Sequence, residues 1–238
     1  MTRAQRIVVL AAALVAALHA LSFLGYGPCD DDYIAYDYAR SLVESGELAF
    51  NAGERVEGFS APGWMLVAAA VIALGGDPAQ ASIVLSALAL ALVTAAIGSL
   101  WFRRHPDDRV GAPAWLVAAS PALAWHSMLG LGTLPLAALL ALAFERWDRA
   151  LREAHTPVFA AALFGLAALV RNEAVLLALP LALQALRARR WQLLGLALGP
   201  LAAWQAFRIA YFGRLVPITY SVKKLDTLVD LRLSRRTW

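Results

Sequence analysis

Long apolar stretches alternate with short polar ones along most of the chain. The apolar runs cover residues 7–25, 61–76, 79–102, 110–144, 157–183 and 191–212. Runs of about 20 apolar residues are typical of helices that cross a membrane. The run 110–144 is interrupted by residues 127–133, and the run 157–183 carries Arg171, Asn172 and Glu173 near its middle. Because a charge at the centre of a lone spanning helix costs about 2.5–3.5 kcal/mol, we expect each of these runs to form a hairpin with its polar residues at the tip.

The positions of the basic residues indicate how the runs are threaded. Four basic clusters separate the runs: Arg3/Arg6, Arg103/Arg104/Arg109, Arg146/Arg149/Arg152 and Arg187/Arg189/Arg190. If the run 61–76 is a half-helix or interfacial helix that enters and leaves by one face, all four clusters fall on the cytoplasmic side, where basic residues are favoured. If the run 61–76 spans the membrane instead, and both hairpins remain, the last three basic clusters lie on the outer side of the membrane. The sequence therefore predicts an all-α, polytopic bundle of about seven spans plus one half or interfacial helix, with a cytoplasmic N-terminus.

Composition agrees with a membrane protein. Hydrophobic residues make up 61% of the 238 residues, charged residues 16%, and the mean hydropathy is +0.62. The run 7–25 resembles a signal peptide but lacks a convincing cleavage site, so a retained first helix is the better interpretation. The net charge of +4 comes from arginines at helix ends and indicates no nucleic-acid partner. The single cysteine, Cys29, excludes an intrachain disulfide.

The predicted threading places four polar segments on the outer face of one module that covers residues 1–238. They are the acidic loop 26–63, the tip 127–133, the tip 171–173 and the tail 213–238. These segments are far apart in the sequence, so their meeting would form a site at the lipid–water boundary.

The acidic loop carries eight of the seventeen carboxylates of the chain. Tyr33, Tyr36, Asp37 and Arg40 recur at helical spacing and predict a helix that begins at the aspartates 30–32. One of these aspartates could cap the helix. Three adjacent carboxylates could also raise one another's pKa and tune one as a general base, or hold a divalent cation through oxygen ligands. The later segment 51–58 is a charged turn that is also compatible with a plain solvated loop.

Ordered motifs in this loop resemble the first extracytoplasmic loop of bacterial GT-C membrane glycosyltransferases. The motifs are Asp30-Asp31-x-Tyr33-Ile34, Tyr38-Ala39-Arg40, Phe50-Asn51-x-Gly53-Glu54-Arg55-Val56-Glu57-Gly58 and Pro62-x-Trp64. They are most similar to the arabinofuranosyltransferase-like branch, which uses polyprenyl-phosphate sugars. Weaker similarities to the same family lie in Leu129–Thr133, in "GLAALVRNEAVLL" and in "RIAYFGRLVPITYSVK".

The resemblance implies a GT-C-like fold and a site in the bacterial inner (plasma) membrane whose active face is extracytoplasmic. Asp30 or Asp31 would be the catalytic base; no cofactor is assigned, and a divalent cation at the aspartates stays open. The residues implied to bind the donor or acceptor are Tyr33, Arg40, Glu54, Arg55, Glu57, Arg171, Glu173, Tyr220 and Lys223. Of these, Arg171, Tyr220 and Lys223 would lie near the donor phosphate, and Glu173 would be either a site residue or the ion-pair partner of Arg171. The implied partners are a polyprenyl-phosphate-linked sugar, a glycan acceptor and membrane lipid, with an apolar wall around Trp64 for the polyprenyl chain.

Three departures from the family pattern bear on activity. Gly132 stands where an acidic residue is usual, Asn172 where proline is usual, and Ile218 where asparagine is usual. Family members also continue beyond the length of this chain, which leaves a fragment, a minimal enzyme and a degenerate homologue open. A non-catalytic, polyprenyl-glycan-binding membrane subunit is therefore the main alternative. A transporter fits less well, because transporters place ionisable residues near the bilayer midplane and most charges here lie in loops.

Overall fold

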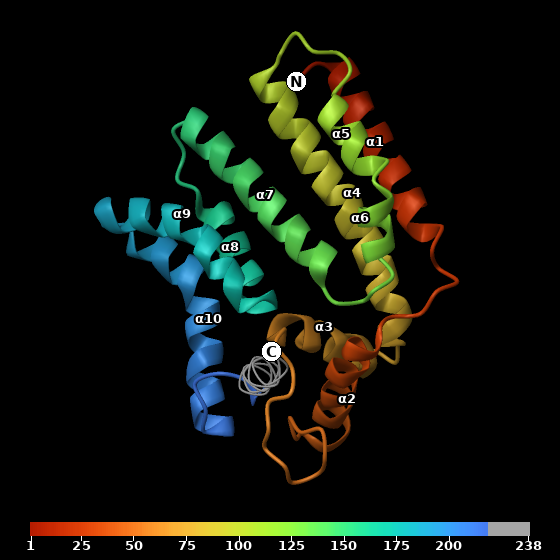
Figure 1. Cartoon of the computed structure of the whole chain (residues 1–238). Coiled ribbons are helices and arrows are strands. Elements are labelled where there is room, and N and C mark those ends of the chain that lie inside the picture. The colour runs from red at the N-terminus through yellow and green to blue at the C-terminus, as the bar shows by residue number, and fades with distance from the viewer. Residues whose placement is uncertain (219–238) are drawn as a thin grey trace, which may run out of the picture.

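The computed structural model describes residues 1–218, and all regular structure in this part is helical (Figure 1). Tyr220 and Lys223 lie outside the described residues. The elements in chain order are α1 (Arg3–Leu21), α2 (Asp30–Ser45), α3 (Pro62–Ala73), α4 (Pro78–Arg104), α5 (Ala112–Ala118), α6 (Pro121–His126), α7 (Thr133–Arg152), α8 (Val158–Val170), the 3-10 turn η1 (Asn172–Ala174), α9 (Val175–Arg187) and α10 (Trp191–Phe212).

The longer helices pack in a row. α1 contacts α4, α4 contacts α7, α7 contacts α8, and α8 contacts α10, while α5 lies against α1 and α4. One end of this row, the basic end, holds the start of α1 and the ends of α4 and α7 (Figure 1). The opposite end, the acidic end, holds α2, α3 and the loop between them (Figure 1). The chain therefore separates its two polar regions to opposite ends of an apolar helical assembly.

Small side chains line the helix contacts. Ala12, Ala16 and Ala20 form a fully buried stripe on α1 that belongs to one core cluster with Leu90 of α4. Small residues at such positions let helix backbones approach closely, as is typical of helices packed in membranes. On the outer side of α1, Leu14 is 60% exposed, so the helix presents leucine to its surroundings rather than burying it.

Three described helices are long and apolar enough to cross a membrane: α1 with 19 residues, α4 with 27 and α10 with 22. This indicates a membrane protein, but the prediction of about seven spans is wrong by this measure. The apolar runs are cut into shorter helices, because Pro121 starts a new helix after α5 and Arg171 separates α8 from α9. α7 is long enough but carries five charged residues in its last eight positions.

Two local predictions are confirmed. The run 61–76 forms the short helix α3, whose 12 residues span about 18 Å at 1.5 Å per residue, well short of a 30 Å membrane core. Pro62 takes its first position, where a missing N–H costs nothing. The run 157–183 forms two helices that pack on each other and meet at Arg171, whose backbone is extended at φ −141° and ψ 127°.

Candidate functional site

The start of α2 places three aspartates in one helical turn without using any of them as the cap. Cys29 occupies the N-cap position, and its side chain makes no capping hydrogen bond. Asp30, Asp31 and Asp32 fill the first turn, where the helix dipole favours negative charge. The capping interpretation is therefore wrong. Because successive helical side chains point about 100° apart, the three carboxylates diverge: Asp30 and Asp31 are exposed and Asp32 is buried.

Asp32 is enclosed by the turn that precedes α7. Asp32 is only 2% exposed, and its carboxylate lies against Gly130. The Cys29 thiol donates a long hydrogen bond of 3.8 Å to Asp32 Oδ2, and the Cys29 backbone N–H donates to Leu129 O at 3.2 Å. The acidic loop is thus joined to the 127–133 tip, although about 100 residues separate them in sequence.

A hydrogen bond from Trp64 links α3 to the same turn. Its indole Nε1 donates to Gly130 O at 2.5 Å, and the residue is 5% exposed. Trp64 is buried, because the turn supplies an acceptor for its N–H within the protein.

Two glycines make this contact possible. Gly130 and Gly132 have φ of +76° and +66°, in the left-handed region that residues with a Cβ avoid. A Cβ at Gly130 would lie 2.3 Å from Asp32 Oδ2, and one at Gly132 would lie 2.9 Å from Trp64 Cγ. In the family that this chain resembles, an acidic residue is usual at the position of Gly132. Such a side chain has no room here, because the Trp64 side chain occupies the space.

Arg171 reaches the same place from the turn between α8 and α9. Its Nε is buried and has no hydrogen-bond partner among the described residues. Burial raises the pKa of Asp32 from 3.8 to about 7. The hydrogen bond from Cys29 and the positive charge on Arg171 lower this pKa, whereas the negative charge on Asp31 raises it. Asp32, Asp31 and Arg171 therefore form one electrostatic unit, which we call the Asp32 cluster.

The chemistry open to this cluster follows from its charges. A carboxyl group with a pKa of about 7 exchanges its proton near neutral pH, which suits general acid–base work. A guanidinium whose Nε–H is not hydrogen-bonded can donate to a phosphate or carboxylate oxygen. Strongly shifted pKa values next to a charge partner are typical of functional sites.

Four other predicted site residues are exposed, three on α2 and one in the turn after α8. Asp30 and Glu173 are exposed. Tyr33 is 49% exposed, and its ring packs edge-on against Tyr36 with centroids 5.7 Å apart. Arg40 lies on the exposed side of α2, where it pairs with Asp37 at 3.2 Å.

The second half of the acidic loop is bound to α10. Glu57 is 1% exposed, and its two oxygens accept hydrogen bonds from Arg208 Nε at 2.6 Å and Arg208 Nη2 at 3.1 Å. Arg55 lies over the Tyr211 ring at 4.9 Å, and Glu54 accepts from Asn51 Nδ2 at 3.0 Å. Glu57 therefore holds the loop in place with both oxygens occupied, and Arg55 contributes a further contact to α10.

The chain beyond α10 returns to the same loop. The Ile218 N–H donates to Glu57 O at 3.2 Å. The acidic loop, the 127–133 tip, the Arg171 turn and the first residues of the tail thus meet at the acidic end. A divalent cation has no matching ligand set in the described part of the chain, where no three His, Cys, Asp or Glu side chains gather.

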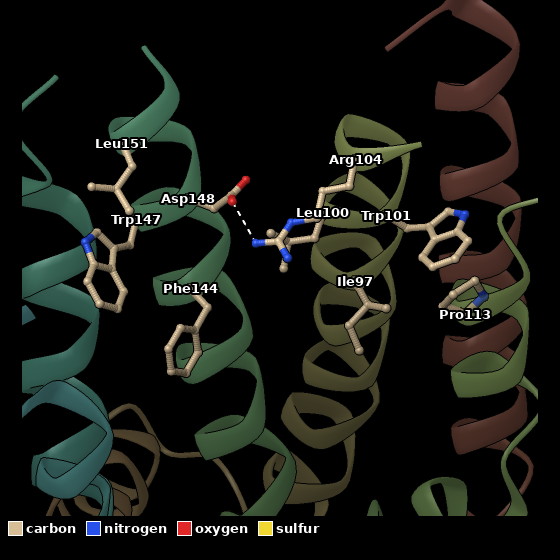
Figure 2. Close-up of a pocket in the computed structure, with 9 residues that line it drawn as sticks. All are labelled: Ile97, Leu100, Trp101, Arg104, Pro113, Phe144, Trp147, Asp148 and Leu151. Carbon is tan, nitrogen blue, oxygen red and sulfur yellow. Dashed lines mark hydrogen bonds and ion pairs between the residues drawn. The ribbon is translucent and has the colours of Figure 1, made fainter. Parts of the chain in front are cut away.

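A groove at the basic end contains none of the predicted site residues. Its volume is about 440 Å³, and Figure 2 shows apolar side chains of α4 and α7 facing it, with Phe144 and Trp147 on one side and Ile97 on the other. Arg104 and Asp148 point toward each other across it and pair at 2.9 Å (Figure 2). Their charges compensate each other, so this groove offers an apolar surface rather than a reactive centre.

Sequence reasoning missed Asp32, Arg208 and the inward position of Trp64. Asp32 had a detectable signal, because it shares helical spacing with Ala35, Tyr36 and Ala39, which are all buried. Arg208 lies within the apolar run 191–212, where an isolated charge indicates a buried partner without saying which one. The position of Trp64 depends on a turn 66 residues away.

Comparison with protein-family models, with curated proteins and with solved structures finds no match to this chain.

Proposed function

We propose that the chain is a membrane glycosyltransferase that moves a sugar from a polyprenyl-phosphate donor to a cell-envelope glycan or lipid acceptor. The observation that carries the proposal is the Asp32 cluster, in which carboxylates and an arginine from distant segments meet at one end of an apolar helical assembly. Such a position gives a lipid-anchored phosphate access to a cation while its chain stays among apolar helices.

In the proposed reaction, an exposed carboxylate of the first α2 turn, Asp30 or Asp31, accepts the proton of the acceptor hydroxyl. The hydroxyl oxygen forms a bond to the anomeric carbon of the sugar as the bond between that carbon and the phosphate oxygen breaks. The leaving group is polyprenyl phosphate, whose charge Arg171 stabilises. Tyr220 and Lys223, which the family resemblance implies near the phosphate, remain part of this proposal.

Asp32 has a separate part in this proposal. It is too enclosed to contact an acceptor directly, but its charge lies near Arg171. We assign it the role of a positioning residue that holds the guanidinium at the acidic end until a phosphate arrives. No cofactor is required by these steps.

The proposed orientation places the basic end in the cytoplasm and the acidic end outside the bacterial plasma membrane. Arg3, Arg6, Arg103 and Arg104 lie at the basic end, and cytoplasmic segments are enriched in such residues. The donor would then be used on the extracytoplasmic face.

Transfer by the purified chain in proteoliposomes tests the proposal. The protein is supplied with a panel of polyprenyl-phosphate sugars and a cell-envelope glycan extract, and released polyprenyl phosphate is measured by mass spectrometry. Replacing Asp30 and Asp31 together by alanine should lower the rate about 10²–10⁴-fold, the usual contribution of a general base. Asp37→Ala/Glu44→Ala removes the same charge from the same helix and should leave the rate within about twofold. Undiminished release by the Asp30/Asp31 variant would refute the assignment.

A non-catalytic polyprenyl-glycan-binding subunit is the second candidate. It is favoured by Trp64, which fills the space that the acidic residue of the resembling family would need at position 132. This function predicts that the chain binds polyprenyl phosphate, that Arg171→Gln weakens this binding, and that no sugar in the panel is released.

A further inference from the structure

A second groove at the basic end is more cationic than the one in Figure 2. It has a volume of about 540 Å³ and lies between α1, α4 and α7, on a face of α4 that carries Ala95, Ser99 and Arg103. Three arginines line it, Arg6, Arg103 and Arg149, together with one glutamate, Glu153. The arginines come from three different helices, α1, α4 and α7, whose basic ends lie at the same end of the row (Figure 1).

The arginines are only partly neutralised. Arg103 pairs with Glu145 at 2.6 Å and Asp148 at 3.7 Å, and Arg149 approaches Glu153 at 3.8 Å on the exposed surface. Arg6 is exposed and has no ion-pair partner among residues 1–218. The groove therefore keeps a net positive charge at its rim.

Apolar surface continues from the groove toward the middle of the helices. Leu10 lines the groove and is 68% exposed, and Leu14 and Leu18 follow it on α1 at helical spacing. On α4, Leu92 and Leu88 are 46% and 54% exposed below Ala95. Both α1 and α4 are long and apolar enough to cross a membrane. The order along both helices is thus cationic rim, then groove, then exposed leucines.

We propose that this groove binds an anionic phospholipid, with its phosphate at Arg6 and Arg149 and its acyl chains along the leucines of α1 and α4. The order of charge and apolar surface matches an anionic headgroup above two hydrocarbon chains. Basic grooves between membrane helices bind anionic headgroups through this complementarity, and each arginine near the surface adds about a fivefold gain in affinity. A water-soluble phosphate would use the rim but leave the exposed leucines unused.

Native mass spectrometry of the purified full chain in detergent tests the proposal. The protein is titrated with phosphatidylglycerol or phosphatidylcholine, and the wild type should bind the anionic lipid about tenfold or more tightly. Arg6→Gln/Arg149→Gln should weaken phosphatidylglycerol binding about 30-fold and leave phosphatidylcholine binding unchanged. Both arginines are exposed, so the variant should fold, which its circular dichroism spectrum checks.

A matched variant separates site binding from net charge. Arg109→Gln/Arg187→Gln removes the same charge from exposed positions outside the groove and should keep the phosphatidylglycerol preference. Glycerol 3-phosphate, which has the anionic group without the chains, should not displace the lipid even in large excess. Equal wild-type affinity for the two lipids, equal loss in both double variants, or displacement by glycerol 3-phosphate would each overturn the proposal.

Discussion

Two buried carboxylates of the acidic loop have opposite surroundings. Glu57 and Asp32 are 1% and 2% exposed, and each has an arginine from a distant helix or turn nearby. Glu57 is held by two charge-assisted hydrogen bonds from Arg208, whose Nη1 also donates to Gln205 Oε1 at 2.5 Å. Asp32 has the 3.8 Å contact with the Cys29 thiol, and Arg171 acts on it through charge alone.

The difference distinguishes a structural ion pair from a reactive group. A buried pair is stable when hydrogen bonds satisfy both ions, and its removal leaves an uncompensated charge. An incompletely paired carboxylate is costly to keep ionised, which is why the pKa of Asp32 rises to about 7. Glu57 therefore fixes the loop to α10, while Asp32 remains able to exchange a proton and to respond to a ligand at Arg171.

The largest expected effect comes from breaking the Glu57–Arg208 pair. Arg208→Met should lower the free energy of unfolding by about 3–5 kcal/mol, because Glu57 is left buried without a partner. Denaturant unfolding of the purified protein, followed by tryptophan fluorescence, measures this change.

A double variant serves as the control for this pair. Glu57→Met/Arg208→Met removes both charges and should recover most of the lost stability, since apolar replacements of a buried pair are often neutral. A loss below about 1 kcal/mol in Arg208→Met alone would contradict the structural role of the pair.

The enclosure of Asp32 is tested by a smaller perturbation. Gly130→Ala should cost about 3 kcal/mol, because the new Cβ both strains a left-handed residue and displaces the Asp32 carboxylate. Gly46→Ala is the matched control: its φ is +74° but no atom lies within 4 Å of the added Cβ, so it should cost only about 1 kcal/mol. Equal losses in the two variants would show that nothing packs against Gly130.

The smallest stability effect should appear only as a pH dependence. Because the pKa of Asp32 is about 7 when folded and 3.8 ordinarily, the folded chain binds an extra proton between these values. The stabilisation from this proton is complete below the lower value and is lost as pH rises through the upper one. Asp32→Asn should therefore flatten the fall of the melting temperature between about pH 4 and pH 7, measured by thermal scans with Asp37→Asn as the control. An unchanged slope in Asp32→Asn would contradict the raised pKa.

Much of the helical architecture was accessible from the sequence. The position of Pro62 and the length of the run 61–76 predicted the short α3, and the charge at Arg171 predicted a turn inside an apolar run. These features depend on local rules, since proline starts helices and charge avoids an apolar midplane. The number of spans could not be predicted in the same way. Composition shows one continuous apolar run where Pro121 and other breaks divide the chain into shorter helices.

The candidate site was accessible only in outline. The threading brought the acidic loop near Arg171, but of the face predicted for α2 from Tyr33, Tyr36, Asp37 and Arg40, only Tyr36 is buried. Choosing Asp32 required knowing that Ala35 and Ala39 pack inward. Its enclosure required Gly130, whose positive φ and distance to Asp32 depend on the tertiary structure.

The central claim is that Asp32 and Arg171 form one electrostatic unit at the acidic end. Infrared titration of the Asp32 carboxyl, assigned by its loss in Asp32→Asn, tests this claim most directly. The wild type should titrate at about 7, Arg171→Gln should move the pKa of Asp32 higher, and Arg40→Gln should leave it unchanged. A carboxyl that titrates near its ordinary value of 3.8, or whose pKa does not respond to Arg171→Gln, would contradict the account.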